Sequence, residues 1–372
     1  MLSTNVSARQ LKFQTLASDL RRGIDAGTWP LGTKLPTERE LAESTGYSIN
    51  TVRRAIDELV RDQLVEVRQG AGMFVVREPR QRRVSESSIG VLLPDTSLYF
   101  PKVLQGIEQT LASAETGLML ATYLYDPVRE TRAIERFMQS NIDGLLLVPS
   151  ISNLDLVMQR IDALEKLGVP VVLIERRFDT LGSADPTEFV CSHHQAGAFA
   201  GVRHLHRLGH ERIALCLREK SWTGRSIRLG FDEAARRFSL KGSLMISAPW
   251  DEWDEPRARA TLKRLQRNGV TAALVFGDRE ATILQSVARK VGIRIPEDLA
   301  IVSYDDETAE LAEVPLTALA PPKHRLGRLA AEVLLNRIRE GEESPIHQIF
   351  LRPRIVVRDS CGSNGPQEPP PA

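Results

Sequence analysis

The chain has 372 residues, of which 42% are hydrophobic and 26% are charged, and its formal net charge at pH 7 is +1. This length predicts two or three domains with ample material for hydrophobic cores. Because the net charge is close to zero, the chain as a whole is not a polycation, and any signal for nucleic-acid binding must be local.

Membrane and export signals are the next features that the sequence addresses. No stretch of about 18 consecutive apolar residues occurs, so we expect no transmembrane helix and no membrane partner. Residues 1–14 lack the apolar centre and the small-residue cleavage site of a secretory signal. Cys191, Cys216 and Cys361 have no metal-ligand spacing and are interpreted as reduced thiols. We therefore expect a cytoplasmic protein.

Composition divides the chain into four segments. Residues 1–78 have helical patterns and one short hairpin, and residues 79–88 have the polar, proline-containing composition of a linker. Residues 89–358 alternate short apolar runs with helical patterns. Residues 359–372 end in a stretch rich in proline and glycine, which predicts a disordered tail.

Three helices are expected in the first segment. Thr37 precedes two glutamates and is a good N-cap for a short second helix, which Gly46 ends. Ser48 is the N-cap candidate for the third helix. Apolar residues that recur at helical spacing form the expected buried faces of the first and third helices: Leu16, Leu20 and Ile24, then Val52, Ile56, Leu59 and Val60.

The third helix has a polar and basic face at its N-terminal end. Two helices joined by a turn, the second with such an end, have helix-turn-helix geometry, in which this end meets base edges in the major groove. Hydroxyl and amide groups there can reach phosphates or adenine, and arginine pairs with guanine or phosphate. A merely solvated helix face is the alternative interpretation.

A glycine-rich hairpin follows the third helix. Residues 64–68 alternate apolar and polar side chains, residues 69–72 contain two glycines, and residues 73–76 are apolar. A hairpin in this place is a wing, and its glycines would let the backbone approach DNA closely. The hairpin favours DNA reading over the solvated-face alternative.

The motifs at residues 32–42, 46–55 and 69–75, in this order, resemble the GntR family of bacterial regulators. The resemblance implies a winged helix-turn-helix, of α+β class, that binds double-stranded operator DNA. The family often has arginine where this chain has Ile49, so its operator is expected to differ. The expected DNA contacts, with Arg54 added from the same helix face, are Arg39, Ser48, Asn50, Thr51, Arg53, Arg54 and Gly70.

Local charge agrees with this interpretation. Residues 1–84 hold 14 Lys and Arg against 10 Asp and Glu, a balance of +4. Arg77, Arg80, Arg82 and Arg83 gather at the linker, where they are either a solvated tether or phosphate contacts.

The third segment predicts an α/β domain. Continuous apolar runs at residues 89–94, 144–149, 170–175, 213–217 and 299–304, separated by helical patterns, are typical of parallel strands buried on both faces. The pattern restarts near residue 195, which predicts two consecutive α/β units and therefore two lobes. Ligands bind beyond the carboxyl ends of such strands, and two facing lobes form a cleft that closes by hinge motion.

The motifs at residues 89–95, 143–149, 301–306 and 315–331 resemble the LacI/GalR effector domain, a two-lobed fold like that of periplasmic sugar-binding proteins. A GntR-type reader joined to such a sensor resembles the arabinose-repressor type of regulator. The resemblance implies a small-molecule effector, by default a sugar, bound on the loops after the strands. The positions that match those loops are Tyr99, Phe100, Ser150, Arg176, Asp278 and Asp305.

These residue types suit a sugar, because carboxylates and arginines bond hydroxyl groups and aromatic faces stack on sugar C–H groups. A structural hydrogen bond within the loop is the alternative for each of them. The family usually has arginine where this chain has Ile227, so Arg225 is included as a substitute contact. Gly277 stands where a polar amide is common, and Pro321 and Pro322 stand where Gln or Asp is frequent.

Other functions are disfavoured. His193 and His194 are adjacent, but no third ligand is placed by spacing, so we expect no metal and no cofactor. The chain has no Gly-x-Ser-x-Gly, His-Glu-x-x-His, phosphate-loop or Cys-x-x-Cys motif, so we expect no enzyme activity. A transport binding protein is the other alternative, which the DNA reader disfavours. We expect a homodimer on a pseudo-palindromic operator, acting as a repressor, although the sequence leaves activation open.

Overall fold

The computed structural model divides into two compact units, residues 1–86 and 87–372, which are described separately. The predicted linker, residues 79–88, extends one residue too far, because Ser88 is the first residue of the first strand of the second unit. Residues 79–86 of that linker, with Arg77, lie outside the described residues. The structure describes residues 13, 16–17, 19–21, 23–24, 28–68, 70–76, 87–150, 157–178, 182, 184–219 and 221–363.

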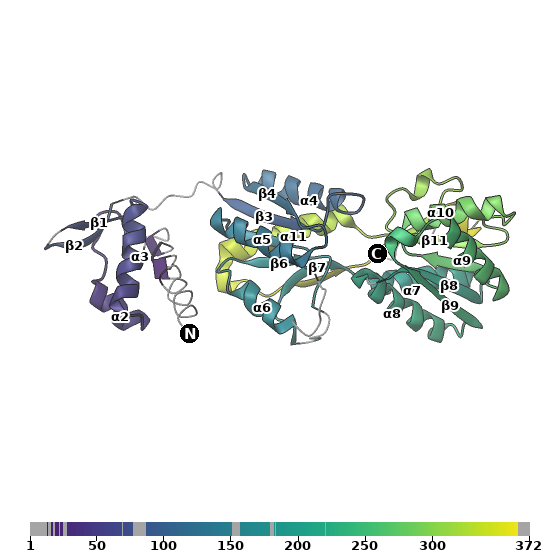
Figure 1. The fold of residues 1–372 in the computed structure, drawn as a ribbon, viewed down its shortest axis with the longest axis horizontal. Coiled ribbons are helices and arrows are strands. Elements are labelled where there is room, and N and C mark those ends of the chain that lie inside the picture. The colour runs from purple at the N-terminus through teal and green to yellow at the C-terminus, as the bar shows by residue number, and fades with distance from the viewer. Residues whose placement is uncertain are drawn as a thin grey trace. The chain divides into compact units, whose positions relative to one another are not determined.

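The first unit has the predicted winged helix-turn-helix (Figure 1). Its described residues between 13 and 24 are helical, and Leu16, Leu20 and Ile24 are buried in its core. The hairpin pairs antiparallel, with Val65 opposite Val75. The labelled elements are α2 (Glu38–Thr45), α3 (Ile49–Arg61), β1 (Val65–Arg68) and β2 (Gly72–Val75).

Caps set the limits of the two central helices. The Thr37 backbone N–H donates to Oε2 of Glu40 at 2.7 Å, and the Thr37 hydroxyl accepts from the Glu40 backbone N–H, which completes a capping box. Gly46 ends α2 in the left-handed conformation. Val60, predicted to be buried, is exposed, because it lies beside rather than on the core face that Val52, Ile56 and Leu59 form.

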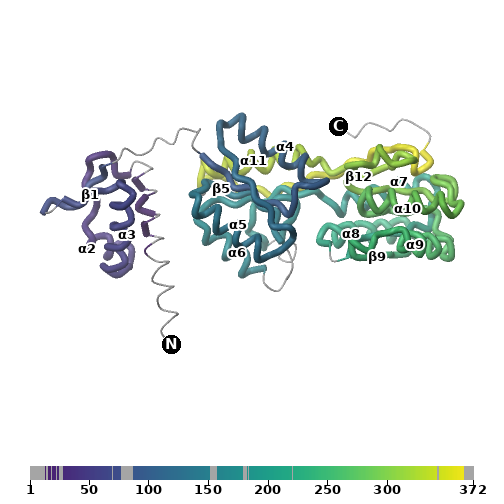
Figure 2. Tube along the Cα trace, turned by 45° about the horizontal axis from the view of Figure 1, so that its top comes forward, coloured from purple at the N-terminus to yellow at the C-terminus, as the bar shows by residue number. Residues whose placement is uncertain are grey.

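The second unit contains two sheets of six strands each (Figures 1 and 2). The first lobe has the strand order β13-β7-β6-β5-β3-β4, and all of its pairings are parallel. Its elements are β3 (Ser88–Leu93), α4 (Phe100–Ser113), β4 (Gly117–Thr122), α5 (Pro127–Gln139), β5 (Gly144–Leu147), α6 (Val157–Glu165), β6 (Val171–Ile174), β7 (Glu188–Ser192), α11 (Lys323–Glu340), η6 (Gly341–Glu343) and β13 (Gln348–Leu351).

The second lobe has the order β14-β12-β11-β10-β8-β9, parallel except for the pairing of β12 with β14. Its elements are α7 (His194–Arg207), β8 (Arg212–Arg218), α8 (Trp222–Arg237), β9 (Gly242–Ala248), η4 (Trp250–Glu252), α9 (Glu255–Arg267), β10 (Ala272–Val275), α10 (Asp278–Lys290), β11 (Ala300–Tyr304), η5 (Ala309–Leu311), β12 (Thr317–Ala320), β14 (Arg354–Val356) and η7 (Asp359–Cys361).

Both sheets are covered on both faces, as the apolar runs predicted. In the first lobe one core joins the sheet to α4 and α11, and another joins it to α5 and α6. In the second lobe the corresponding cores involve α9 and α10 on one face and α7 and α8 on the other. All residues of β5 and β10 are buried, which is why their sequences read as continuous apolar runs.

The two lobes are not consecutive in sequence, and this part of the prediction is wrong. The chain passes between them three times: at His193, at Pro321 and Pro322, and at residues 352–353. Helix α11 and strand β13 therefore return to the first lobe, where α11 packs on α4. A methyl group at Gly327 would lie 2.0 Å from the Val103 carbonyl oxygen, so glycine allows this close crossing.

The second lobe also continues beyond residue 358, where the disordered tail was predicted to begin. Ser360 and Cys361 of η7 are buried, and the Ser360 hydroxyl donates to the Ile301 carbonyl at 2.6 Å. The remainder of that tail, residues 364–372, lies outside the described residues. Across the residues that the structure describes, no helix is both long enough and apolar enough to traverse a bilayer.

Candidate functional site

The start of α3 is the first candidate surface. The Ser48 hydroxyl accepts from the Thr51 backbone N–H at 3.2 Å and lies 2.8 Å from the Thr51 hydroxyl. Asn50 is exposed beside them, and Ile49 is 47% exposed. The two hydroxyls are therefore engaged with each other at the helix cap, whereas the Asn50 amide faces solvent at the position where a groove reader presents a base contact.

Arg53 is held by a second helix. Its Nη2 lies 2.8 Å from Oε2 of Glu38 and its Nε lies 3.3 Å from Oε1, so the ion pair is bidentate and joins α3 to α2. The hydrogen bond and charge of Glu38 raise the pKa of Arg53. The pair is exposed, so a phosphate or a guanine edge can replace Glu38 without disturbing the core.

The other predicted DNA contacts have different surroundings. Arg39 is strongly exposed and pairs loosely with Glu43 at 3.3 Å. Gly70 has φ +75° in the turn between β1 and β2, a conformation that favours glycine. Arg54 lies with its guanidinium carbon 4.3 Å from the centre of the Phe13 ring, which directs it toward the first helix. Its surroundings favour a packing role over base contact.

The second candidate site lies where the two lobes of the second unit meet. We call it the interlobe cluster, and it comprises Tyr99, Tyr125 and Arg176 from the first lobe and Arg218 and Asp305 from the second. The lobes are close there, because Lys323 donates to the Asp305 carbonyl and its Nζ lies 5.1 Å from the centre of the Tyr99 ring. Cationic, anionic and aromatic groups from both lobes thus share one region.

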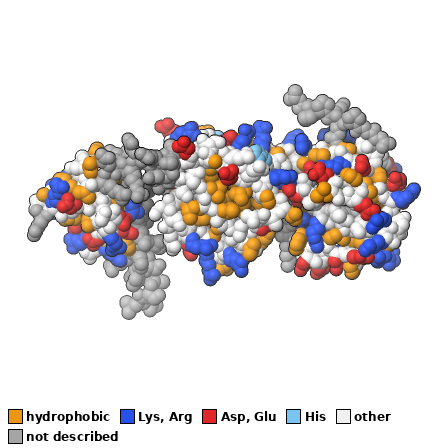
Figure 3. Space-filling view, turned by 90° about the horizontal axis from the view of Figure 1, so that it is seen from above, with side chains coloured by type: hydrophobic (Ala, Val, Ile, Leu, Met, Phe, Trp, Pro, Cys, Tyr) orange, Lys and Arg blue, Asp and Glu red, His pale blue; other side chains and the backbone are white. Residues whose placement is uncertain are grey.

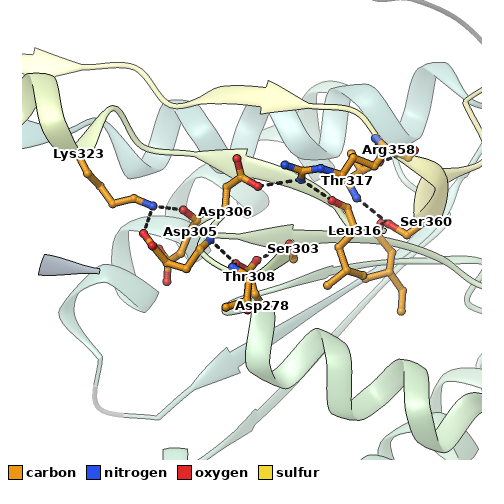
Figure 4. A network of polar contacts seen from close by, with 12 residues as sticks. Asp278, Ser303, Asp305, Asp306, Thr308, Leu316, Thr317, Lys323, Arg358 and Ser360 are labelled. Atoms are coloured by element: carbon orange, nitrogen blue, oxygen red, sulfur yellow. Dashed lines mark hydrogen bonds and ion pairs between the residues drawn. The ribbon is translucent and has the colours of Figure 1, made fainter. Parts of the chain in front are cut away.

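Asp305 is the central acid of this cluster. It follows β11, has φ +95°, and its backbone N–H donates to Leu319 at 2.9 Å. Burial raises the pKa of its carboxyl to about 6, although Arg218 and Lys323 act in the opposite direction. Lys323 is buried, donates to the Asp305 carbonyl and pairs with Glu307 (Figure 4). Lys323 thereby fixes the loop that carries Asp305. It bonds to the backbone carbonyl of Asp305 and not to the side-chain carboxylate.

Arg176 is the corresponding base from the first lobe. Its Nη1 donates weakly to the Tyr123 hydroxyl at 3.5 Å and to the Pro149 carbonyl at 3.4 Å. Its guanidinium carbon lies 5.4 Å from the centre of the Tyr125 ring. Both bonds come from Nη1, and a further hydrogen bond joins the guanidinium to Tyr125, so other N–H groups of Arg176 can serve a ligand.

Four residues predicted to touch a ligand have other surroundings. Asp278 is buried, and its carboxylate accepts from the Ser303 hydroxyl and from the backbone N–H groups of Glu307 and Thr308 (Figure 4). Phe100 is buried in the first-lobe core. The Ser150 backbone N–H donates to Glu130, and Arg225 is exposed near the Trp222 ring. The loop hydrogen bond named as the alternative describes Asp278 best.

Sequence reasoning missed a buried polar network at the crossing between lobes. The Tyr99 hydroxyl donates to Oε1 of Glu175 at 2.7 Å, and the Ser192 hydroxyl donates to Oε2 at 2.9 Å. His194 has Nε2 2.7 Å from Glu175 and Nδ1 2.9 Å from the Tyr304 hydroxyl. The chain Tyr99–Glu175–His194–Tyr304 connects the lobes. No sequence motif indicated this network, because most of its members are far apart in sequence.

Glu175→Gln should lower the free energy of unfolding by about 2 to 3 kcal/mol at pH 7, because it removes the charge from a buried, fully bonded carboxylate. Burial would raise the pKa of Glu175, but His194, Tyr99 and Ser192 lower it below its ordinary value. The carboxylate therefore stabilises the fold above about pH 4.5, and this contribution is lost as the pH falls through the folded-state pKa. Denaturant unfolding between pH 3 and 8 should show a deficit that is constant above about pH 5 and shrinks below it.

The matched control for that experiment is Glu165→Gln, an exposed glutamate at the end of α6. Its unfolding free energy should follow the wild type at every pH. A Glu175→Gln deficit that stayed constant down to pH 3 would contradict the assignment of the ionised carboxylate to the network.

In the described part of the chain, no group of three or more His, Cys, Asp or Glu side chains could hold a metal ion. His193 caps α7 through Nδ1, which accepts from the Ala196 backbone N–H at 3.2 Å, and His194 belongs to the interlobe network. The adjacent histidines thus have structural partners.

Comparison with known proteins agrees with both units. Residues 12–75 match the model of bacterial regulatory proteins of the gntR family, and residues 202–361 match the periplasmic binding protein-like domain. The arabinose metabolism transcriptional repressor of Geobacillus stearothermophilus is 31% identical over 361 residues, which cover 94% of this chain and 97% of that relative.

Two solved structures share the fold. The structure of a transcriptional regulator CelR–cellobiose complex has a TM-score of 0.62 at 23% identity and covers 88% of this chain and 100% of that one. The structure of a LacI family regulator from Enterococcus faecium with bound ribose has a TM-score of 0.61 at 24% identity and covers 74% and 98%. With these matches on both units, the chain belongs to the family of bacterial transcriptional repressors that join a GntR-type DNA-binding domain to a periplasmic-binding-protein-like domain.

Proposed function

We propose that this protein represses transcription by binding its operator as a homodimer, and that a sugar bound at the interlobe cluster lowers its affinity for that operator. It acts in the cytoplasm, where its operator lies, and it acts by binding alone, without catalysing a reaction. Arabinose is the first candidate effector, because relatives that cover nearly the whole chain are named for arabinose metabolism.

The observation that carries this proposal is the composition of the interlobe cluster. It offers a guanidinium with N–H groups to spare on Arg176, a carboxylate on Asp305 and aromatic rings on Tyr99 and Tyr125, drawn from both lobes. Hydroxyl groups both donate and accept, so a sugar satisfies the acid and the base at once. A ligand that bonds to both lobes stabilises the arrangement in which they are close, which is a differential affinity of the kind that allostery requires.

For DNA, the proposed contacts are the exposed side chains Asn50, Arg53 and Arg39 and the turn at Gly70, with Ser48 and Thr51 at the cap of α3. The base-reading end of α3 and the wing are the parts of a winged helix-turn-helix that face a duplex. For Arg54 we propose a phosphate contact and no base contact, because its guanidinium packs on Phe13.

Dimerisation is proposed through the C-terminal unit. Strand β4 is an edge of the first sheet, and its Leu120 is exposed, as is Leu124 shortly after it. Hydrophobic side chains gather on one face of this lobe in Figure 3. An exposed edge with apolar side chains is a surface that a second copy can cover, and a two-fold protein matches a palindromic operator.

Footprinting on the protein's own upstream DNA tests the proposal. We expect two protected half-sites separated by about one helical turn, or a multiple of it, and loss of protection when arabinose, ribose or cellobiose is added. Light scattering should give twice the monomer mass. Protection that is absent, or that none of the three sugars changes, would contradict the proposal.

A further inference from the structure

Arg218, which sequence reasoning did not select, is held in one orientation at the end of β8. Its Nε lies 2.9 Å from Oε1 of Glu280 and its Nη2 lies 2.8 Å from Oε2. Glu280 is fully buried in the first turn of α10. Burial by itself would lower the pKa of Arg218, but Glu280 raises it above the ordinary value. The pair therefore fixes a charged guanidinium rather than leaving it to move.

The outer edge of this guanidinium remains available. A guanidinium has five N–H groups, and the bidentate pair uses two of them. Among the described residues no other acceptor bonds Arg218, and 22% of its side chain is exposed. Its charge interacts with Asp305 and with Tyr125 of the other lobe, and its guanidinium carbon lies 4.9 Å from the centre of the Phe276 ring. Arg218 ends β8, and Asp305 follows β11 at the same edge of the sheet, with only β10 between these strands, so the three remaining N–H groups are open to a ligand at this edge.

Gly277 makes room for the pair. A methyl group at this position would lie 2.1 Å from Oε2 of Glu280 and 2.2 Å from Nη2 of Arg218, and φ is +107°. Any larger side chain would push the two charged groups apart. The resemblance predicted a polar amide at position 277, and such a side chain would collide with Arg218 and Glu280. The ion pair therefore accounts for the glycine.

The position three residues before Gly230 does not supply an arginine to the second lobe. Ile227 stands where an arginine was expected from the resemblance, and it is fully buried in the second-lobe core. Arg225, the substitute suggested by sequence, is exposed near Trp222. Neither of these two positions thus places a guanidinium beside Glu280, whereas Arg218 does.

We propose that Arg218, oriented by Glu280 and given room by Gly277, is the second-lobe donor that binds the effector, and that this arrangement selects a neutral hydroxylated ligand over a carboxylated one. The inference rests on the proposed function and names the determinant of its ligand class. Glu280 is bidentate to Arg218 and also lies 3.6 Å from Nη1 of Arg279, and the charge of Asp305 acts on Arg218 as well. A ligand carboxylate at the outer edge of Arg218 would therefore meet a cation that is already paired and a second acid. Hydroxyl oxygens meet neither penalty.

Calorimetric titration of the full-length protein with arabinose, ribose, cellobiose and arabinonate tests this. Replacing Arg218 alone would leave the buried Glu280 carboxylate without its main partner. The main variant is therefore Arg218→Met combined with Glu280→Gln. For the neutral sugar that the wild type binds most tightly, affinity should fall about 10- to 100-fold, the loss typical of a charged hydrogen-bond donor. Operator binding without sugar should be unchanged, which shows that the variant is folded.

Two further variants sharpen the test. Arg225→Ala, the matched arginine on α8, should bind sugar within a factor of about two of the wild type. Glu280→Gln alone removes the balancing charge from Arg218 and should move the preference toward arabinonate relative to arabinose.

The outcomes separate the two proposals. A folded, operator-binding double variant that binds sugar as the wild type does would overturn the assignment of Arg218 and leave the proposed function standing. A wild type that binds none of the neutral sugars would overturn both together. Tighter wild-type binding of arabinonate than of arabinose would overturn the selection of a neutral ligand.

Discussion

Arg53→Ala should weaken binding to the footprinted operator by about 10- to 100-fold, the effect of removing one arginine contact to a base edge or phosphate. Arg53 is exposed at the start of α3 and is oriented by Glu38 from α2. The side chain makes no core contact that its loss would disturb, so the unfolding free energy should change by less than about 0.5 kcal/mol. Fluorescence anisotropy with operator and scrambled duplexes measures the first quantity, and denaturant unfolding measures the second.

The control lies on the same helix. Arg61 is exposed in the last turn of α3, far along the helix from its base-reading end, so Arg61→Ala should keep operator affinity within about threefold. Glu38→Gln releases Arg53 without removing it and should strengthen binding to operator and scrambled DNA alike, since one negative charge is lost near the phosphates. Equal affinities for Arg53→Ala and the wild type would remove Arg53 from the interface.

Asp305→Asn should uncouple the repressor from its effector while stabilising the fold. The carboxylate is the acid of the interlobe cluster, and replacing it should lower sugar affinity about tenfold or more, with operator binding in the absence of sugar unchanged. Because burial raises the folded-state pKa to about 6, the carboxyl is mostly ionised at neutral pH, and this buried charge destabilises the folded protein relative to the unfolded chain. An amide of the same shape avoids that cost, by about 1 to 3 kcal/mol.

The stabilisation expected from Asp305→Asn should depend on pH. A raised folded-state pKa means that the folded protein binds more protons than the unfolded chain between the ordinary pKa and about 6, so the wild type loses stability as the pH rises through that window. The advantage of Asp305→Asn should therefore be small below pH 4 and should reach its plateau above about pH 6.5. Thermal unfolding across this range measures it.

Asp306 supplies the matched control one residue away. Its carboxylate lies 2.7 Å from the half-buried Arg358, so Asp306→Asn removes a favourable partner and should destabilise the protein at neutral pH (Figure 4). Opposite signs for the two neighbouring substitutions are expected. A destabilising Asp305→Asn, or one that still responds fully to sugar, would contradict the role given to Asp305.

Local features of the fold could be predicted from the sequence because they are encoded locally. The caps at Thr37 and Ser48, the turn at Gly46 and the hairpin through Gly70 depend on nearby residues, and the structure has each of them where it was expected. The parallel strands were recognisable because a strand buried on both faces is apolar throughout, as β5 and β10 are.

The membership of each strand in a sheet could not be predicted in this way. An apolar run such as β13 carries no mark of the sheet it joins, so the return of α11 and β13 to the first lobe was missed. The same limit applies to the site. Arg218 and Glu280 are 62 residues apart, and Glu175 and Tyr304 belong to different lobes. Phe100 and Asp278 were predicted as ligand contacts from the family resemblance, and the sequence did not indicate that Phe100 would pack in the first-lobe core or that Asp278 would accept hydrogen bonds from Ser303 and Glu307.

A repressor of this kind should bind one DNA sequence in preference to others, and its effector should change that affinity. Anisotropy titrations of the full-length wild type at fixed physiological salt, with the footprinted operator and a scrambled duplex, test it most directly. We expect at least about 1,000-fold tighter binding to the operator, and a 5- to 150-fold loss of that affinity on addition of arabinose, ribose or cellobiose. Equal, salt-sensitive binding to both duplexes, unchanged by all three sugars, would contradict the account.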